Sequence, residues 1–201
     1  MTPLGADAHD EGRGSTAREA HDGGRPHGAQ ARSARLELVS MRHRHLRQVM
    51  AIEHQVFPEP WSLAIFNSEL ALRTGRAYRV AKVGRRVVGY VGLMIVTDEA
   101  HVTTLAVAPE SQHQGIGTEI LLRGVLLARE LGARQLSLEV AAHNARAQAL
   151  YRRFGLAPVG VRKGYYQKTG EDALVMVVDD IGSEAYSRRL AQIEAWLRSP
   201  E

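Results

Sequence analysis

The apolar positions of the chain recur at helix and strand spacings from about residue 35 onward. A helical spacing over residues 46–57 ends before Pro58, and Ser62 is placed to cap a second helix. Two β-rich runs, residues 76–83 and 86–96, are separated by a short turn. This first part is therefore predicted to form two helices followed by a β-hairpin.

Strands then alternate with helices, and a final pair of strands follows. The predicted segments are residues 100–107 (strand), 116–131 (helix), 135–140 (strand), 144–154 (helix), and 158–166 with 172–178 (an antiparallel pair). This order predicts an α/β fold, in which helices cover both faces of a mixed, mostly antiparallel twisted sheet. It predicts one domain over residues 35–180, and residues 181–201 add a C-terminal helical extension.

The first 34 residues are expected to be disordered. They contain one leucine and no aromatic residue, so they cannot bury enough apolar surface to offset the entropy lost on ordering. His9, His21 and His27 lie in this segment, far apart and without carboxylates at ligand spacing. No metal site is therefore expected from them.

Composition excludes several kinds of chemistry. The 201 residues include no cysteine, which rules out disulfides, thiolate zinc sites and cysteine nucleophiles. No apolar run approaches the ~20 residues that span a bilayer, and the N-terminus lacks the apolar core of a signal peptide. We expect a cytoplasmic protein without membrane contact. The net charge of +4 fits either a solvated basic surface or an anionic partner, such as a phosphorylated cofactor or a ribosomal setting.

The strongest local motif is the turn Gln112-His113-Gln114-Gly115-Ile116-Gly117, which joins a strand to a helix. A helix N-terminus presents unpaired N–H groups and a partial positive charge. Two glycines allow a phosphate to approach those donors closely. The Lys-Ser/Thr pair of nucleotide hydrolases and the third glycine of the dinucleotide fingerprint are both missing. The turn alone remains compatible with an ordinary glycine-containing helix start.

Two further residues are candidates for acid–base chemistry. Glu139 alternates with the apolar residues of its strand and so points to the opposite face, where an acid must be solvated or paired. Tyr151 lies in an amphipathic helix beside Leu150 and Phe154. A salt-bridged structural glutamate and a core tyrosine are the alternatives for this pair.

Together these segments resemble the GCN5-related N-acetyltransferase (GNAT) superfamily, whose pyrophosphate motif is Q/R-x-x-G-x-G/A after a strand. The resemblance implies acetyl-CoA as the acetyl donor and no metal. It further implies that the strand before the turn bulges, splays from its neighbour and offers its backbone to the pantetheine arm. The cofactor-binding residues implied by the resemblance are Leu105, Ala106, Val107, His113, Gln114, Gly115, Ile116, Gly117, Thr118 and Asn144.

Between about residues 36 and 179 the chain is similar to one subfamily, the bacterial ribosomal-protein-alanine N-acetyltransferases, which acetylate the amino terminus of small-subunit protein S18. The matching segments are Pro60-Trp61-Ser62, Glu139-Val140-Ala141-Ala142-His143-Asn144, Ala149-Leu150-Tyr151, Phe154-Gly155, Arg162-Lys163-Gly164-Tyr165-Tyr166 and Glu171-Asp172-Ala173. The resemblance implies Glu139 as proton acceptor and Tyr151 as proton donor, and it places the acceptor near Trp61, Tyr165 and Tyr166. It implies a protein N-terminus, that of S18, as the acceptor, without any need for direct nucleic-acid binding.

Without a cysteine nucleophile, we expect the amine to attack the thioester directly in a ternary complex. Other acceptors remain open on the same scaffold: a lysine, a polyamine or an antibiotic amine. A non-catalytic module that binds acetyl-CoA or RNA is the alternative outside enzymology.

Overall fold

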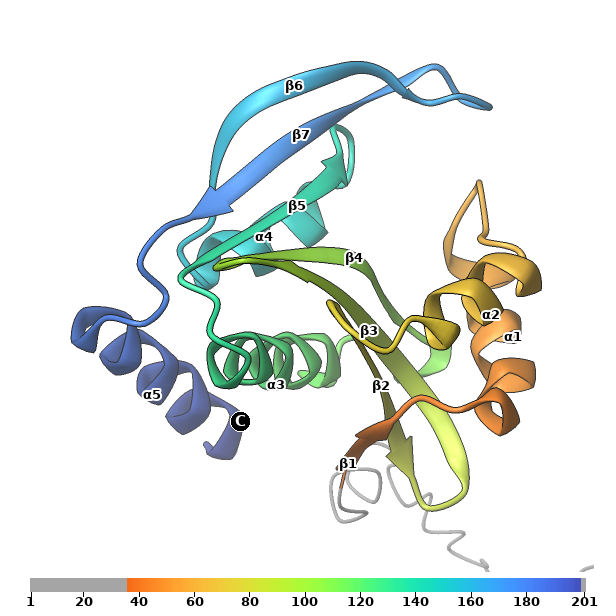
Figure 1. The fold of residues 1–201 in the computed structure, drawn as a ribbon, viewed down its shortest axis with the longest axis horizontal. Coiled ribbons are helices and arrows are strands. Elements are labelled where there is room, and N and C mark those ends of the chain that lie inside the picture. Colours follow the sequence, from red (N-terminus) through yellow and green to blue (C-terminus); the bar gives the residue numbers. More distant parts are fainter. Residues whose placement is uncertain (1–35, 200–201) are drawn as a thin grey trace, which may run out of the picture. The chain divides into compact units, whose positions relative to one another are not determined.

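A seven-stranded sheet in the order β1-β2-β3-β4-β5-β7-β6 forms the centre of the molecule (Figure 1). The computed structural model describes residues 36–199, so the disorder expected for residues 1–34 lies outside the described residues. The strands are β1 (Leu36–Ser40), β2 (Arg76–Val83), β3 (Arg86–Val96), β4 (Glu99–Val107), β5 (Gln135–Ala141), β6 (Ala157–Tyr166) and β7 (Glu171–Val178). The helices are η2 (His43–His45), α1 (Leu46–Val56), α2 (Leu63–Ala71), η3 (Pro109–Ser111), α3 (Ile116–Glu130), α4 (Ala145–Arg153) and α5 (Glu184–Arg198).

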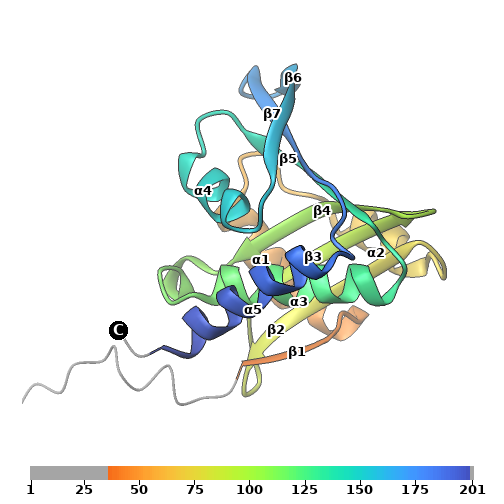
Figure 2. The same ribbon diagram turned by 90° about the vertical axis from the view of Figure 1, so that its left-hand side faces the viewer.

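Among the strands of residues 36–199, one neighbouring pair, β4 and β5, runs parallel, and the other pairs are antiparallel. Helices lie on both faces, as Figures 1 and 2 show. This confirms the predicted fold class. β1 is missing from the sequence-based prediction, because its five residues form a short edge strand that pairs on one side only and carry too brief an alternation to be recognised.

Two apolar clusters hold these layers together. On one face, α1 and α2 bury Val49, Ile52 and Phe66 against Tyr90 of the sheet. On the other face, α3 packs on β3 and β4, and the same cluster includes residues from β5, α4 and α5. The Ser62 side chain accepts a hydrogen bond from the Ile65 N–H at 3.2 Å, so α2 begins at the predicted cap.

The C-terminal helix α5 is part of this packing. Its buried residues Tyr186, Leu190 and Ile193 belong to the cluster that contains α3. Arg129 of α3 also donates a hydrogen bond to the Ser187 hydroxyl at 2.8 Å. Figure 2 shows α5 crossing α3, with its last turn on the side where α3 begins.

Candidate active site

The sheet opens between β4 and β5. Their parallel ladder joins Glu99–Val102 to 135–138 and then stops, although both strands continue. A bulge accounts for the change of direction: Gly92 pairs with Thr104 and Leu93 with Val102, so that Thr103 is left as the extra residue. Such a bulge bends a strand and increases its twist. The result is a slot between residues 103–107 of β4 and residues 139–141 of β5.

The glycine turn lies at the end of β4, beside this slot. The Gln112 side chain donates a hydrogen bond to the Val107 carbonyl at 3.0 Å, which ties the turn to the strand. His113 and Gly115 have positive φ values of 64° and 77°. At Gly115 this left-handed conformation favours glycine, because a Cβ atom would be strained there.

This turn leaves a row of backbone donors unpaired. Within residues 36–199, no hydrogen-bond acceptor reaches the N–H groups of residues 113–118. Alternating left- and right-handed residues at a helix start form a concave nest of N–H groups, which binds anions. The Arg146 guanidinium donates to the His113 ring at 2.8 Å and adds a positive charge nearby. The turn therefore has the chemistry that a pyrophosphate requires.

Two of the cofactor-binding residues predicted from the sequence, Thr118 and Asn144, each have only one polar group left to contact a ligand. Thr118 is buried, which leaves its unpaired backbone N–H as the group available to a ligand. Asn144 caps α4, and its side-chain oxygen accepts from the Ala147 N–H at 3.0 Å. The remaining NH₂ group of Asn144 is the part that could reach a ligand.

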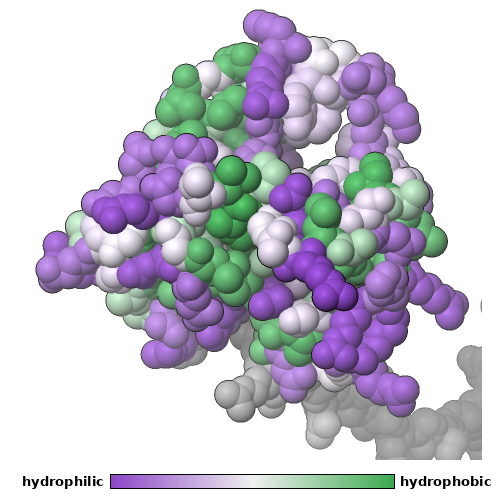
Figure 3. All heavy atoms as spheres, in the orientation of Figure 1, coloured by the Kyte–Doolittle hydropathy of each residue, from purple (hydrophilic) through white to green (hydrophobic). Residues whose placement is uncertain are grey.

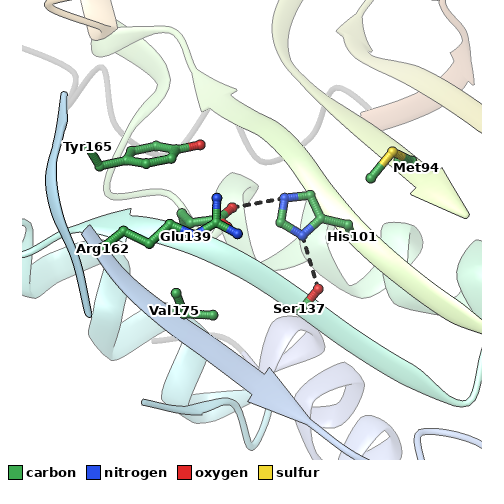
Figure 4. A pocket seen from close by; sticks show the side chains of 7 residues that line it. All are labelled: Met94, His101, Ser137, Glu139, Arg162, Tyr165 and Val175. Carbon is green, nitrogen blue, oxygen red and sulfur yellow. Dashed lines mark hydrogen bonds and ion pairs between the residues drawn. The ribbon is translucent and has the colours of Figure 1, made fainter. Parts of the chain in front are cut away.

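Glu139 is held between two basic side chains on the opposite face of β5 from the α3 cluster. Its carboxylate, 8% exposed, lies 3.1 Å from an Arg162 nitrogen and 2.9 Å from His101 Nε2. His101 Nδ1 in turn lies 3.0 Å from the Ser137 hydroxyl. Figure 4 shows Arg162 and His101 converging on Glu139. The surrounding pocket of about 300 Å³ is lined by Met94, His101, Ser137, Glu139, Arg162, Tyr165 and Val175.

The sequence pattern by itself does not identify His101 or Arg162 as residues of the site. Period-two alternation does place His101 of β4 and Ser137 of β5 on one face, and the two residues are opposite each other in the parallel register. That register depends on which strands pair, which the sequence does not show. Arg162 reaches Glu139 only because β6 and β7 fold back beside β5.

Tyr151 approaches from the other face of the sheet. It is buried in the apolar cluster that includes Leu138 and Val140, the neighbours of Glu139 on β5. Burial, and to a smaller extent the nearby Tyr166, raises the pKa of Tyr151 to about 12. Its hydroxyl therefore stays protonated at any physiological pH and can serve as a hydrogen-bond donor.

Tyr165 lines the pocket around Glu139, and Tyr166 follows it at the end of β6. The Tyr165 and Tyr166 rings meet edge to face, 5.2 Å apart. Burial raises the pKa of Tyr166 to about 12, and the negative charges of Glu171, Glu139 and Glu59 act in the same direction. Trp61 belongs to the segment joining α1 to α2, and its ring lies 5.4 Å from that of Phe66.

The segment that carries Trp61 also approaches the β6–β7 hairpin. The Lys168 N–H donates a hydrogen bond to the carboxylate of Glu59. Figure 3 shows the surface hollowed between the sheet half that carries β5, β6 and β7 and the α1–α2 region. The hydrogen bond from Lys168 to Glu59 therefore links the segment of Trp61 to the hairpin that carries Tyr165 and Tyr166.

The turn, the splayed strands and the fold together define an acetyltransferase. The model of the acetyltransferase (GNAT) family matches residues 46–156, and the chain belongs to this family. Enzymes of this family use acetyl-CoA, and the unpaired N–H groups of the turn fit its pyrophosphate.

Several individual proteins are similar to this chain over most of their length. The chain is 40% identical over 139 residues to a Bacillus subtilis protein provisionally assigned as a ribosomal protein bS18-alanine N-acetyltransferase, covering 69% of this chain and 92% of that protein. It is 37% identical over 131 residues to the N-alpha-acetyltransferase RimI of Mycobacterium tuberculosis, and the match covers 62% of this chain and 80% of that protein. The crystal structure of the ribosomal-protein-S18-alanine N-acetyltransferase from Escherichia coli superposes with a TM-score of 0.67 at 28% sequence identity. The superposition covers 73% of this chain and 94% of that protein.

Two kinds of feature are absent from residues 36–199. No helix there has the length and apolarity needed to cross a membrane. In the same range, no three His, Asp or Glu side chains gather as a metal-binding group.

Proposed function

We propose that this acetyltransferase transfers the acetyl group of acetyl-CoA to the N-terminal α-amine of a protein, with ribosomal protein S18 as its acceptor. The relatives named above as S18-alanine N-acetyltransferases support the choice of acceptor. The observation that carries the proposal is the ion pair between Glu139 and Arg162 beside the slot, 3.1 Å long. It gives the site a proton acceptor and, next to it, a fixed positive charge.

The donor is held from two sides. Its pyrophosphate binds the N–H groups of residues 113–118, and its pantetheine arm lies along Leu105, Ala106 and Val107, whose edge faces the slot. The thioester carbonyl then lies in the slot, where a backbone N–H of β4 stabilises the negative charge that develops on its oxygen. The NH₂ group of Asn144 adds a polar contact.

The charge of the site favours an acceptor amine that has already lost its proton. An ammonium group beside Glu139 would have to compete with the Arg162 guanidinium. A peptide α-amine titrates near ~8 and a lysine near ~10.4, so at pH 7 the neutral fraction of the α-amine is roughly two hundredfold larger. N-terminal amines therefore suit this site better than lysines or polyamines.

Proton transfer accompanies the bond changes. The amine nitrogen attacks the thioester carbon, a C–N bond forms, and Glu139 accepts the proton that the nitrogen loses. His101 and Ser137 extend from Glu139 as a hydrogen-bonded chain by which that proton can leave. As the C–S bond breaks, the departing sulfur receives a hydrogen bond from Tyr151, which burial keeps protonated. No covalent acetyl-enzyme is formed, because the amine attacks the thioester directly.

The test is an acetylation assay with acetyl-CoA and a short peptide that carries the S18 N-terminus. We expect thiol release, and mass spectrometry should locate the acetyl group on the α-amine. The matched control is the same peptide with a formylated N-terminus and an internal lysine, which should remain unmodified. Silence on every N-terminal peptide, together with strong turnover of spermidine or another small amine, would refute the proposed acceptor.

A further inference from the structure

The last turn of α5 lies directly beside the glycine turn, although α5 is outside residues 46–156 that match the family. A Cβ atom added to Gly115 would lie 3.4 Å from Leu197 Cδ2 and 4.0 Å from Trp196 Cζ3. Figure 2 shows the same relationship, since α5 runs across α3 and ends near the start of that helix. The end of α5 is therefore next to the nest that fits a pyrophosphate.

The position of this turn is set by the core. Tyr186, Leu190 and Ile193 anchor α5 in the apolar cluster that contains α3. Trp196 follows Ile193 by three positions, which is close to one helical turn. Its side chain therefore leaves α5 on nearly the same side as the buried Ile193. The tryptophan is therefore held beside Gly115 by packing.

Trp196 presents an aromatic surface together with a cation. Its side chain remains 42% exposed, unusually open for the largest apolar residue type. The guanidinium carbon of Arg153, at the end of α4, lies 4.1 Å from the centroid of the Trp196 ring. No acidic side chain among residues 36–199 forms an ion pair with Arg153. An open aromatic ring, with a cation that has no acidic partner among those residues, lies beside a phosphate nest and matches the chemistry of a nucleotide.

We propose that Trp196 and Arg153 bind the adenine nucleotide end of coenzyme A, with the base on Trp196 and the ribose 3′-phosphate next to Arg153. The inference rests on the acetyl-CoA donor of the proposed function. In coenzyme A the pyrophosphate is bonded directly to the ribose that carries adenine. A pyrophosphate in the nest therefore leaves the nucleotide within a few bonds of the end of α5.

Calorimetric titration with three ligands separates the binding contributions of the adenine base, the 3′-phosphate and the rest of coenzyme A. Coenzyme A carries the base and the 3′-phosphate, 3′-dephospho-coenzyme A lacks that phosphate, and 4′-phosphopantetheine lacks the whole nucleotide. Trp196→Ala should weaken coenzyme A binding about tenfold, as expected for loss of one stacked base, and leave 4′-phosphopantetheine unchanged. Trp196→Phe should retain most of the affinity. Arg153→Gln should reduce the preference for coenzyme A over its 3′-dephospho form.

The matched control is Arg188→Gln, on the exposed face of α5 near its start. It should leave all three affinities unchanged. Equal weakening of coenzyme A and 4′-phosphopantetheine by Trp196→Ala would mean that the tryptophan only fastens α5, and unchanged affinities would also overturn the inference. The titrations contain no acceptor peptide, so their outcome does not depend on whether the peptide assay succeeds. If the wild-type protein does not bind coenzyme A, acetyl-CoA as the donor is contradicted.

If Trp196→Ala does not fold, tryptophan fluorescence can test whether the adenine base stacks on Trp196. The chain contains two tryptophans, so a Trp61→Phe protein reports on Trp196 alone. Its emission should change on addition of coenzyme A and stay constant with 4′-phosphopantetheine. An equal response to both ligands would contradict stacking of the base on Trp196.

Discussion

The carboxylate of Glu53, in α1, accepts a hydrogen bond from the backbone N–H of Trp61 at 2.8 Å. The Tyr90 hydroxyl donates to the same carboxylate, which is only 1% exposed. This buried acid thus fixes the segment that leads into α2 and carries Trp61, one of the residues near which we expect the acceptor to bind. Burial raises its pKa from 4.5 to about 7, and the hydrogen bond from Trp61 opposes part of that increase.

The raised pKa of Glu53 predicts that stability falls as pH rises. Between about pH 4.5 and 7 the folded chain holds a proton that the unfolded chain has released, so each step upward favours unfolding. The full effect is about 3 kcal/mol. Glu53→Gln, which keeps an acceptor for Trp61, should remove this dependence and unfold later than wild type at pH 8. Urea unfolding at several pH values measures it, with the exposed Glu37→Gln as control; an unchanged pH slope in Glu53→Gln would contradict the prediction.

The two glycines of the turn should respond differently to alanine. Gly115→Ala forces a Cβ into a left-handed conformation with φ of 77°, so it should cost about 1–2 kcal/mol of stability and weaken coenzyme A binding. At Gly117 a Cβ would lie 3.6 Å from Leu150 and Val107, an ordinary contact distance. Gly117→Ala should therefore be neutral or slightly stabilising. Thermal unfolding with and without coenzyme A tests both, and equal losses in the two variants would show that φ is not the cause.

Removal of the Glu139 carboxylate or of the Tyr151 hydroxyl should slow acetylation without loss of the fold. Glu139→Gln and Tyr151→Phe are each expected to lower kcat about 10²–10⁴-fold, the usual contribution of a general acid or base. Because the pKa of Tyr151 is about 12, the wild-type rate should show no alkaline decline from this residue below pH 10. Steady-state rates from pH 6 to 10 provide the measurement.

Tyr186→Phe is the matched control for Tyr151→Phe. Burial raises the pKa of Tyr186 to about 12 as well, and within residues 36–199 its buried hydroxyl has no hydrogen-bond partner. Loss of that hydroxyl should leave the rate unchanged and the stability equal or higher. If Glu139→Gln and Tyr151→Phe both kept the full rate, the proposed proton path would be wrong.

Arg162 should influence the choice of acceptor. Arg162→Ala removes the cation beside Glu139, so kcat/KM for cationic small amines should rise relative to N-terminal peptides. The guanidinium is 58% exposed and screened by water, which limits the change to about fivefold. The neighbouring Lys163→Ala, whose ion pair is with Asp172, should leave the ratio unaltered. A competition assay with a peptide and spermidine measures it, and a constant ratio in Arg162→Ala would count against selection by charge.

The sequence was sufficient where the signal is local. Ser62 caps α2 as predicted, and the glycine turn joins β4 to α3 at the expected place. These features depend on residues within one or two turns of each other. Their positions follow from backbone preferences that each residue carries by itself.

The partners of the site could not be predicted because they come from distant strands. His101 and Arg162 meet at Glu139 only after β5 has paired with β4 on one side and β7 on the other. The opening of the slot depends on the extra residue Thr103, whose own identity does not mark a bulge. Glu53 is a further example, since an acid on a helix is normally read as a solvated position.

The packing of α5 also decides where this protein can be cut. A fragment that ended with β7 would omit Tyr186, Leu190 and Ile193, which fill the same apolar cluster as α3. Such a fragment would expose the outer side of α3 and invite aggregation during expression. For recombinant work, the C-terminal boundary should therefore follow Arg198 and not the limit of the family match.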